Sequence, residues 1–422
     1  MNLNKEKLII NSATFFMQKY IDKHLKIGKN KGKIPVCDDK NKKLLYIHLP
    51  FCTMFCTYFY FNKYIYDKEK SKEYFKSLRE EILHVKELGY DFDKLVIGGG
   101  TPLIDEDELL KTIELSKSLF SIKHVSCESD PNHIDIKTLD KFKGLIDRLS
   151  IGVQTFDDSI LAKLGRFEKF GSAKEVYEKI EKIIGVLPTI SVDLIFNFPA
   201  QTQKGLINDL EILKKLSPQQ TSLYPLMTSK AVKNSIRKTL GKFNLDNEYK
   251  FFNIIKENLK DAYPFRQGWS FSKETKQEID EYVIENDDYI GVGSGSFSFL
   301  KNVLYVNEFL LEEYIKLIKT QKSAVTKKQE FTIKSQMYYR IMVGLFGGHL
   351  SKNSFKTFFG KNIENSLKSE LSLLKLSNAI KEDKDEIKTT PFGDYLFVTL
   401  MKEFYIGMDK IRQSERKKIL IS

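Results

Sequence analysis

The feature that most constrains the fold of this chain is a regular alternation of short apolar segments with longer amphipathic ones. The apolar segments are typical of buried strands and span 44–49, 94–97, 125–128, 148–154, 190–195 and 221–224. The segments between them repeat apolar residues at helical spacing and span 71–88, 105–119, 136–144, 171–185 and 203–216. Six such strands in series, joined by helices, predict an α/β fold with a parallel sheet. A right-handed series of this length can curl, so we expect a partial (β/α)6 TIM-like barrel.

The segments before and after this series follow other patterns. Further helices are predicted over 5–27, 246–262, 306–319 and 330–347. Between them, 287–298 is expected to form a short strand and a loop of small residues. The chain is thus divided into an N-terminal helix with a linker, a barrel core, a barrel extension with substrate-side loops, and a C-terminal helical, winged-helix-like domain, over 1–43, 44–228, 229–325 and 326–422.

Composition narrows the classes of function. Apolar residues make up 41% of the 422 residues, which is enough for a large core, and 4 Cys are too few for a disulfide scaffold. No run of about 18 apolar residues occurs and the N-terminus does not resemble a secretory signal, so we expect a cytoplasmic protein without a membrane span. The net charge is +12, but its Lys residues are interspersed with acidic residues, as on a solvated surface. Nucleic-acid binding is therefore the least favoured function.

Polar or ligand-type residues follow all six predicted strands. In strand order they are Cys52 and Cys56, the run Gly98–Gly100, Glu128, Gln154, Asp193 and Tyr224. Because the carboxyl ends of parallel strands share one rim, these residues are expected to lie together. The pattern favours a catalytic or cofactor-binding mouth over a purely structural barrel.

The stretch Tyr46-Ile47-His48-Leu49-Pro50-Phe51-Cys52-Thr53-Met54-Phe55-Cys56 resembles the cluster loop of radical S-adenosylmethionine enzymes. More narrowly, it resembles the oxygen-independent coproporphyrinogen III oxidases and their relatives, the heme chaperones and anaerobic heme-degrading enzymes. The resemblance runs from about 44 to 300 and weakly to 400. It implies a [4Fe–4S] cluster on Cys52 and Cys56, S-adenosylmethionine as cofactor, a tetrapyrrole as substrate, and an electron donor such as flavodoxin or ferredoxin.

Four further motifs carry this resemblance, at 98–102, 128–131, 148–156 and 193–202. The last matches the family pattern with Asn197 in place of Gly. The first two imply that the glycine backbone and the Glu128 carboxylate hold the amino end of S-adenosylmethionine. The resemblance assigns cofactor binding to Tyr46, Tyr58, Gly99, Gly100, Thr101, Glu128, Gln154, Arg166, Asp193, Met227 and Phe297.

One departure bears on the chemistry. The family loop is Cys-x3-Cys-x2-Cys, but this chain has Phe59 at the third position, and Phe has no lone pair to offer iron. Cys127 precedes Glu128 on a strand and is expected to point to the opposite face. Cys37, in the polar linker, is the expected replacement, and a phenolate from Tyr58 or Tyr60 is an unusual alternative.

Three functions are compatible with these patterns. The first is a radical enzyme that modifies a tetrapyrrole, by oxidative decarboxylation of coproporphyrinogen or by opening heme, with Trp269 to Ser272 and the 287–298 loop near the substrate. The second is a heme-binding or heme-delivery protein, with His48, His124, His133 and the Cys pair as candidate iron ligands. The third is nucleic-acid binding through the C-terminal domain.

Overall fold

The structure is a computed structural model, and it describes residues 3–25, 27, 32–54, 62–228, 230–243, 246–274 and 288–419. Its centre is a 12-stranded sheet with the order β14-β13-β12-β11-β1-β4-β5-β6-β7-β8-β10-β9. Seven neighbouring strands of it are parallel: β11 (Tyr289–Val292), β1 (Lys43–Leu49), β4 (Phe92–Gly99), β5 (His124–Ser129), β6 (Arg148–Gln154), β7 (Thr189–Phe196) and β8 (Gln220–Pro225). The six strands predicted from the alternation are confirmed, and β11 adds a seventh beside β1.

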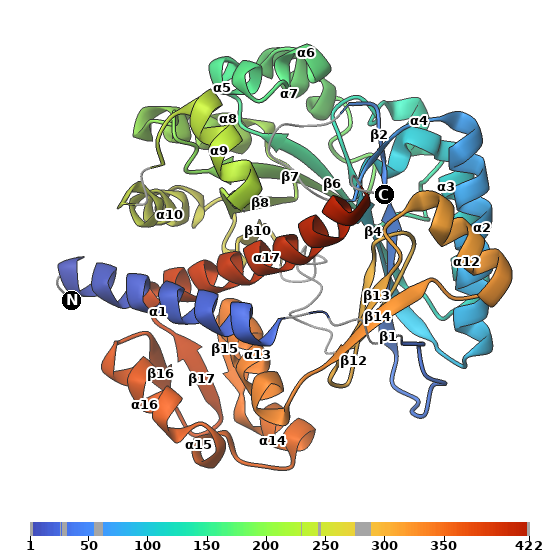
Figure 1. Cartoon of the computed structure of the whole chain (residues 1–422). Coiled ribbons are helices and arrows are strands. Elements are labelled where there is room, and N and C mark those ends of the chain that lie inside the picture. The colour runs from blue at the N-terminus through green and yellow to red at the C-terminus, as the bar shows by residue number, and fades with distance from the viewer. Residues whose placement is uncertain are drawn as a thin grey trace.

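Helices follow these strands and cover one face of the sheet (Figure 1). They are α2 (Lys68–Glu87), η1 (Pro102–Asp105), α3 (Glu106–Leu119), α4 (Ile136–Asp140), α5 (Asp158–Lys163), α6 (Phe167–Phe170), α7 (Ala173–Glu181) and α8 (Gln203–Leu216). Side-chain caps explain several starts, because Asp67, Asp135, Ser172 and Thr202 accept hydrogen bonds from the first turns of their helices. The predicted helix at 171–185 is shorter in the structure: α7 begins at Ala173, where Ser172 and Glu175 form a capping box, and ends at Glu181.

The chain after β8 extends the sheet at both edges with antiparallel strands. β9 (Phe265–Gln267) and β10 (Ser270–Ser272) pair beside β8. β12 (Phe297–Leu300), β13 (Val303–Asn307) and β14 (Val325–Glu330) continue from β11. The predicted helix at 306–319 was wrong at its start, because 303–307 pairs as β13 and the helix α12 spans Leu311–Gln321. Two helices, α9 (Lys230–Leu240) and α10 (Asp246–Leu259), precede β9, and two strands, β2 (Phe51–Cys52) and β3 (Tyr64–Ile65), pair separately.

The C-terminal part has helices around a three-stranded antiparallel sheet of order β15-β17-β16. Its elements are α13 (Ile333–Phe346), β15 (His349–Ser351), α14 (Lys352–Phe359), α15 (Ile363–Ser366), α16 (Lys368–Leu376), β16 (Ile380–Glu382), β17 (Glu386–Thr389) and α17 (Pro391–Ile419). The long helix α17 and the N-terminal helix α1 (Leu3–His24) lie side by side across the face of the sheet opposite to α2 and α3 (Figure 1).

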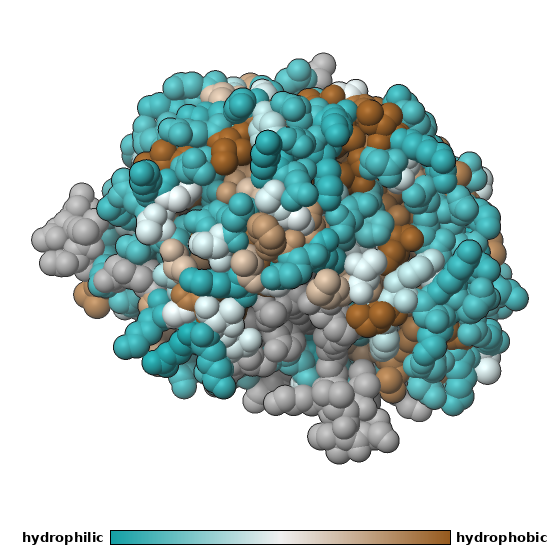
Figure 2. Space-filling view, turned by 90° about the horizontal axis from the view of Figure 1, so that it is seen from above, coloured by the Kyte–Doolittle hydropathy of each residue, from teal (hydrophilic) through white to brown (hydrophobic). Residues whose placement is uncertain are grey.

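Burial follows the strand pattern. In β5, Val125 and Cys127 are buried against the helices, whereas Glu128 is exposed on the face turned toward α1 and α17. The face of the molecule seen in Figure 2 is mostly hydrophilic with separate hydrophobic patches. No helix in the described ranges is long and apolar enough to cross a membrane.

Candidate functional site

One cavity of about 880 Å³ lies between the carboxyl ends of the parallel strands and the helices α1, α13, α16 and α17. Its wall includes Cys52 and every described residue to which the resemblance assigned S-adenosylmethionine binding: Tyr46, Gly99, Gly100, Thr101, Glu128, Gln154, Arg166, Asp193, Met227 and Phe297. The two remaining predicted residues, Cys56 and Tyr58, lie outside the described residues. The shared rim expected from the strand ends is thus a single cavity, while the ligand that each residue holds stays a prediction.

The glycine run and Glu128 meet at one point of this wall. The Gly99 amide donates a 3.0 Å hydrogen bond to Glu128 Oε2. A β-carbon at position 98 would lie 2.7 Å from the Glu128 carboxyl, and one at position 100 would overlap the Phe51 carbonyl oxygen. Gly99 itself has a φ of +116°, a conformation that residues with side chains rarely adopt. Each glycine is therefore required by the close approach of backbone and carboxylate.

The carboxyl end of β6 is locally irregular. The pairing with β7 shifts register between Gly152 and Gln154, and Gln154 has a φ of +80°. Such a bulge with a left-handed non-glycine residue costs conformational energy and turns a side chain toward a site. Arg166 donates from Nη2 to the Gly152 carbonyl oxygen, and its guanidinium lies 4.5 Å from the centre of the Phe170 ring. The bulge and the buried arginine together place an amide and a cation at the cavity wall.

Two carboxylates complete the polar wall. Asp193 accepts hydrogen bonds from Ser150 Oγ at 2.5 Å and from Ser191 Oγ at 3.2 Å. Asp130 accepts one from Thr101 Oγ1 at 3.0 Å. Burial raises the pKa of Asp130, but the hydrogen bond and charge of His133, the nearby Lys169 ammonium and the Asn132 amide together outweigh burial and lower that pKa. Asp130 is therefore a charged group at neutral pH, buried beneath the glycine run.

The cysteines occupy three different places. Cys52 is 3% exposed, lines the cavity, and lies 3.9 Å from Thr101 Oγ1. Cys127 is buried in the core between sheet and helices, as expected, and burial raises the pKa of its thiol. Cys37 was the expected replacement for the third cluster cysteine, and this expectation is wrong. Its amide donates to the Leu88 carbonyl oxygen near the amino end of β1. Cys52 lies beyond the carboxyl end of β1, and the seven residues of this strand rise about 20 Å.

The three histidines expected as iron ligands do not lie together in the structure. His48 lines the cavity, but Tyr46 OH lies 3.1 Å from its Nδ1 and the Asn62 carbonyl oxygen lies 3.1 Å from its Nε2. Burial lowers the pKa of His48 to about 4, so the imidazole is neutral and accepts from the tyrosine while it donates to the carbonyl. His124 is exposed at the amino end of β5, and His133 pairs with Asp130. In the described chain, no three His, Cys, Asp or Glu side chains group so as to hold a metal ion.

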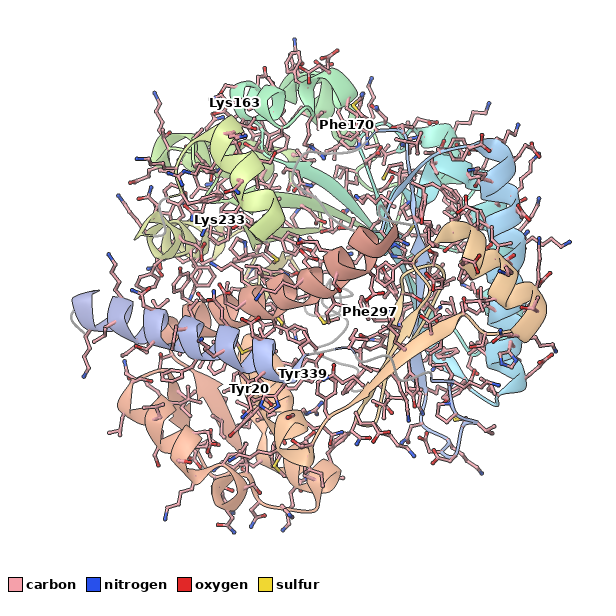
Figure 3. The ribbon with its side chains drawn as sticks, in the orientation of Figure 1. Tyr20, Lys163, Phe170, Lys233, Phe297 and Tyr339 are labelled. Atoms are coloured by element: carbon pink, nitrogen blue, oxygen red, sulfur yellow. The ribbon has the colours of Figure 1, made fainter. Side chains whose placement is uncertain are left out.

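The second half of the cavity is aromatic and helical, and of its residues only Tyr224 and Trp269 were predicted from the sequence. Its rings form a continuous series with centroid separations between 5.2 and 6.2 Å, through Phe331, Phe299, Tyr339, Phe404, Tyr405, Trp269 and Tyr224. A second group comes from α1 and α13, where the Tyr20 ring lies 5.7 Å from the Tyr338 ring. Figure 3 labels Tyr20 of α1 and Tyr339 of α13, both of which line the cavity. In the sequence, these helices are marked only by their apolar stripes. Such a stripe indicates that one face of a helix is buried, but not which segment of the chain packs against that face.

Three cations extend the cavity wall beyond the predicted set, and one of them is Lys169, whose Nζ lies 3.7 Å from Asp130 Oδ2. Arg412 of α17 forms a 2.7 Å ion pair with Asp409, and its guanidinium lies 5.4 Å from the centre of the Phe297 ring. Lys63 follows the cluster-loop segment and lines the same cavity. The cavity therefore combines an acidic and amide-rich floor, an aromatic wall, and basic groups at its edge.

Comparison with known proteins agrees with this geometry. Residues 46–213 match the model of the radical SAM superfamily. The heme chaperone HemW of Bacillus subtilis is 27% identical over 84% of this chain and 97% of its own length. The oxygen-independent coproporphyrinogen III oxidase of Helicobacter pylori is 33% identical over 46% of this chain and 44% of its own length.

Among solved structures, the coproporphyrinogen III oxidase HemN of Escherichia coli, described as a radical SAM enzyme, superposes with a TM-score of 0.72 at 20% identity. That match covers 86% of this chain and 90% of the other. The match confirms the α/β fold with its large parallel sheet. Residues 46–213 are therefore similar to the radical SAM superfamily, and the chain as a whole is similar to heme chaperones and, over about half of its length, to oxygen-independent coproporphyrinogen III oxidases.

Proposed function

We propose that this chain binds a tetrapyrrole, with heme as the first candidate, in a cavity whose floor binds S-adenosylmethionine. The observation that carries the proposal is the continuity of the polar floor with the aromatic wall in one cavity. A volume of about 880 Å³ is near the upper end for pockets that hold one organic ligand, so it suits a large planar molecule beside a smaller one. Basic groups such as Arg412 suit the carboxylates that tetrapyrroles carry.

The floor suits S-adenosylmethionine by its chemistry. Glu128 offers a carboxylate to an ammonium group, and the glycine run lets a ligand approach backbone N–H and C=O groups. Gln154 offers an amide, and Arg166 brings a cation that favours a carboxylate. These residues bind and orient the cofactor, and the helices α1 and α17 limit the access of water to it.

The cysteines do not fit the family's three-thiolate cluster. Position 59 is Phe, Cys37 lies near the opposite end of β1, and Cys127 lies in the core, so only Cys52 and Cys56 remain for this site. A [4Fe–4S] cluster held by two thiolates lacks a protein ligand that radical chemistry in this family uses. This mismatch favours binding and delivery of heme over radical catalysis, and the similarity to heme chaperones supports the same choice.

Hemin titration of the purified full-length chain tests the proposal. We expect a saturable Soret band and quenching of the fluorescence of Trp269, the single tryptophan, which lines the cavity. We also expect S-adenosylmethionine to bind in isothermal titration calorimetry, and Glu128→Gln to weaken only that binding. The matched control is Glu168→Gln, which changes an exposed carboxylate outside the cavity. Absence of saturable binding of either ligand would contradict the proposal.

A second candidate function is radical modification of the tetrapyrrole, favoured by the retention of Glu128, Gln154, Arg166 and Asp193 at one cavity. It requires a reductant such as flavodoxin or ferredoxin and a third cluster ligand that is not cysteine. Anaerobic reconstitution with iron and sulfide, followed by electron paramagnetic resonance with and without S-adenosylmethionine, separates the two functions. Under the heme-binding proposal, the parent protein gives no S-adenosylmethionine-sensitive cluster signal, whereas Phe59→Cys gains one. A signal in the parent would favour the enzyme.

A further inference from the structure

The part of the cavity wall contributed by α1 contains a histidine that the cofactor floor does not use. Ala13, Met17, Tyr20 and His24 recur at three- and four-residue spacing, so they share one face of α1, and all four line the cavity. The His24 ring is stacked on the Tyr20 ring with centroids 4.5 Å apart and an interplanar angle of 28°. The imidazole is therefore held in the aromatic half of the cavity rather than above the glycine floor.

The other histidines are unsuited to bind iron in this cavity. The chain has 6 His, and only His24 and His48 line the cavity. Both ring nitrogens of His48 are engaged with Tyr46 and Asn62. The contacts of His24 are its ring stack and a hydrogen bond to its backbone carbonyl oxygen from Gln329. Within the described part of the chain, neither ring nitrogen of His24 has a hydrogen-bond partner.

Helix α1 is fixed in place by contacts of its C-terminal part. Gln18 Nε2 donates to Glu403 Oε2 at 2.7 Å, Tyr20 OH donates to Ser335 Oγ at 2.6 Å, and Asp22 forms a 2.7 Å ion pair with Lys410. These contacts join α1 to α17 and to α13, so the face with Tyr20 and His24 keeps its direction. The cavity opens between α1 and α16, where the lining residues Phe16 and Leu373 are 69% and 68% exposed.

We propose that His24 is an axial iron ligand of a heme that enters between α1 and α16 and lies against the aromatic wall. The proposal rests on the proposed tetrapyrrole binding and adds which side chain binds the heme iron and where in the cavity the heme lies. A neutral imidazole nitrogen is the commonest protein ligand of heme iron, and the rings of Tyr20, Tyr338 and Tyr339 are suited to contact a porphyrin plane. The coordination bond forms by donation of a nitrogen lone pair and needs no oxidant or reductant.

The test compares His24→Ala with His349→Ala, which removes a histidine outside the cavity. Each full-length, tag-free protein is titrated with hemin and, separately, with iron-free protoporphyrin IX. We expect His24→Ala to shift the Soret band and to weaken hemin binding by roughly tenfold or more, with protoporphyrin binding unchanged. Added free imidazole is expected to restore the parent spectrum in His24→Ala, which a misfolded variant would not show. His349→Ala is expected to behave as the parent.

Three outcomes overturn the assignment. If His24→Ala gives the parent spectrum and affinity while both porphyrins bind, heme is bound without this ligand and the proposed function stands alone. If Met17→Leu, and not His24→Ala, changes the hemin spectrum, the thioether of the same helix face is the ligand. If the parent binds neither hemin nor protoporphyrin, the proposed function fails, and the ligand assignment fails with it.

Discussion

Gly407 of α17 lies against Ile21 of α1 so closely that a β-carbon at position 407 would stand 2.5 Å from Ile21 Cγ2. Ile21 is the buried residue of α1, with 5% of its surface exposed. The two helices that close the cavity therefore pack at a contact that only glycine permits.

We predict that Gly407→Ala moves α1 away from α17. The added methyl group is expected to cost about 1–3 kcal/mol through overpacking, partly offset by about 1 kcal/mol from the better helix propensity of Ala. Hydrogen exchange of the α1 peptide should become faster, and hemin affinity should fall. Gly205→Ala in α8 is the matched control, because its β-carbon meets a neighbour only at 3.4 Å. An α1 peptide protected as in the parent would contradict the prediction.

Gly98→Ala is predicted to disrupt the cofactor floor. Its β-carbon would lie 2.7 Å from the Glu128 carboxyl, so the carboxylate must leave its place beside the Gly99 amide. We expect S-adenosylmethionine affinity to fall by roughly tenfold or more, measured by calorimetry. Because the aromatic wall is not touched, hemin binding should remain. Equal loss of both ligands would indicate a general folding defect, which circular dichroism would reveal.

The stability of the protein is predicted to fall in mild acid because of His48. Its pKa is lowered to about 4 in the folded protein by burial, whereas the ordinary value is 6.5. As pH falls, His48 therefore becomes protonated at a higher pH in the unfolded chain than in the folded protein. The contribution of His48 to the free energy of unfolding is fully present above pH 6.5 and is lost as pH falls toward about 4.

The shift corresponds to about 3 kcal/mol when converted at 1.36 kcal/mol per pKa unit. Chemical unfolding at pH 7.5 and at pH 5 should show a smaller loss of stability for His48→Gln than for the parent. His349→Gln, at an exposed position, should lose as much as the parent. An identical pH dependence of the parent and His48→Gln would refute this assignment.

A buried ion pair is predicted to hold α17 against α10. Lys402 Nζ lies 2.6 Å from Glu248 Oε1, and the side chains of the pair are 8% and 3% exposed. Tyr395 OH and Asn197 Nδ2 also donate to Glu248. Because removal of one partner leaves a buried charge, we expect Lys402→Met to cost about 3–5 kcal/mol of unfolding free energy.

The double variant Lys402→Met with Glu248→Gln is expected to recover part of this loss, since no unpaired charge remains. Unfolding midpoints of the single and double variants measure the coupling. Additive losses in the double variant would show that the two groups do not interact energetically.

Asn197→Gly tests the departure from the family pattern. Asn197 has a φ of +68°, which glycine also adopts, so only the contact with Glu248 should be lost.

Much of the parallel sheet and the cavity floor was predictable from the sequence because both depend on local patterns. The apolar runs locate β1 and β4 to β8 within a few residues, and the polar residues at their ends share one rim whatever the details of packing. The start of α12 was not predictable, since 303–307 has a pattern compatible with helix until β12 and β14 pair beside it. Pairing between distant strands decides such segments.

The sequence alone determined the strand–helix order, the glycine and acidic residues of the floor, and the Phe at position 59. Only the tertiary structure decided that α1 and α17, whose residues Gln18 and Glu403 are 385 positions apart, close the cavity together. It also decided that Cys37 lies at the far end of β1 and that His24 faces an aromatic wall. The physical reason is that helical periodicity specifies which face is buried, while packing across the whole chain selects the partner.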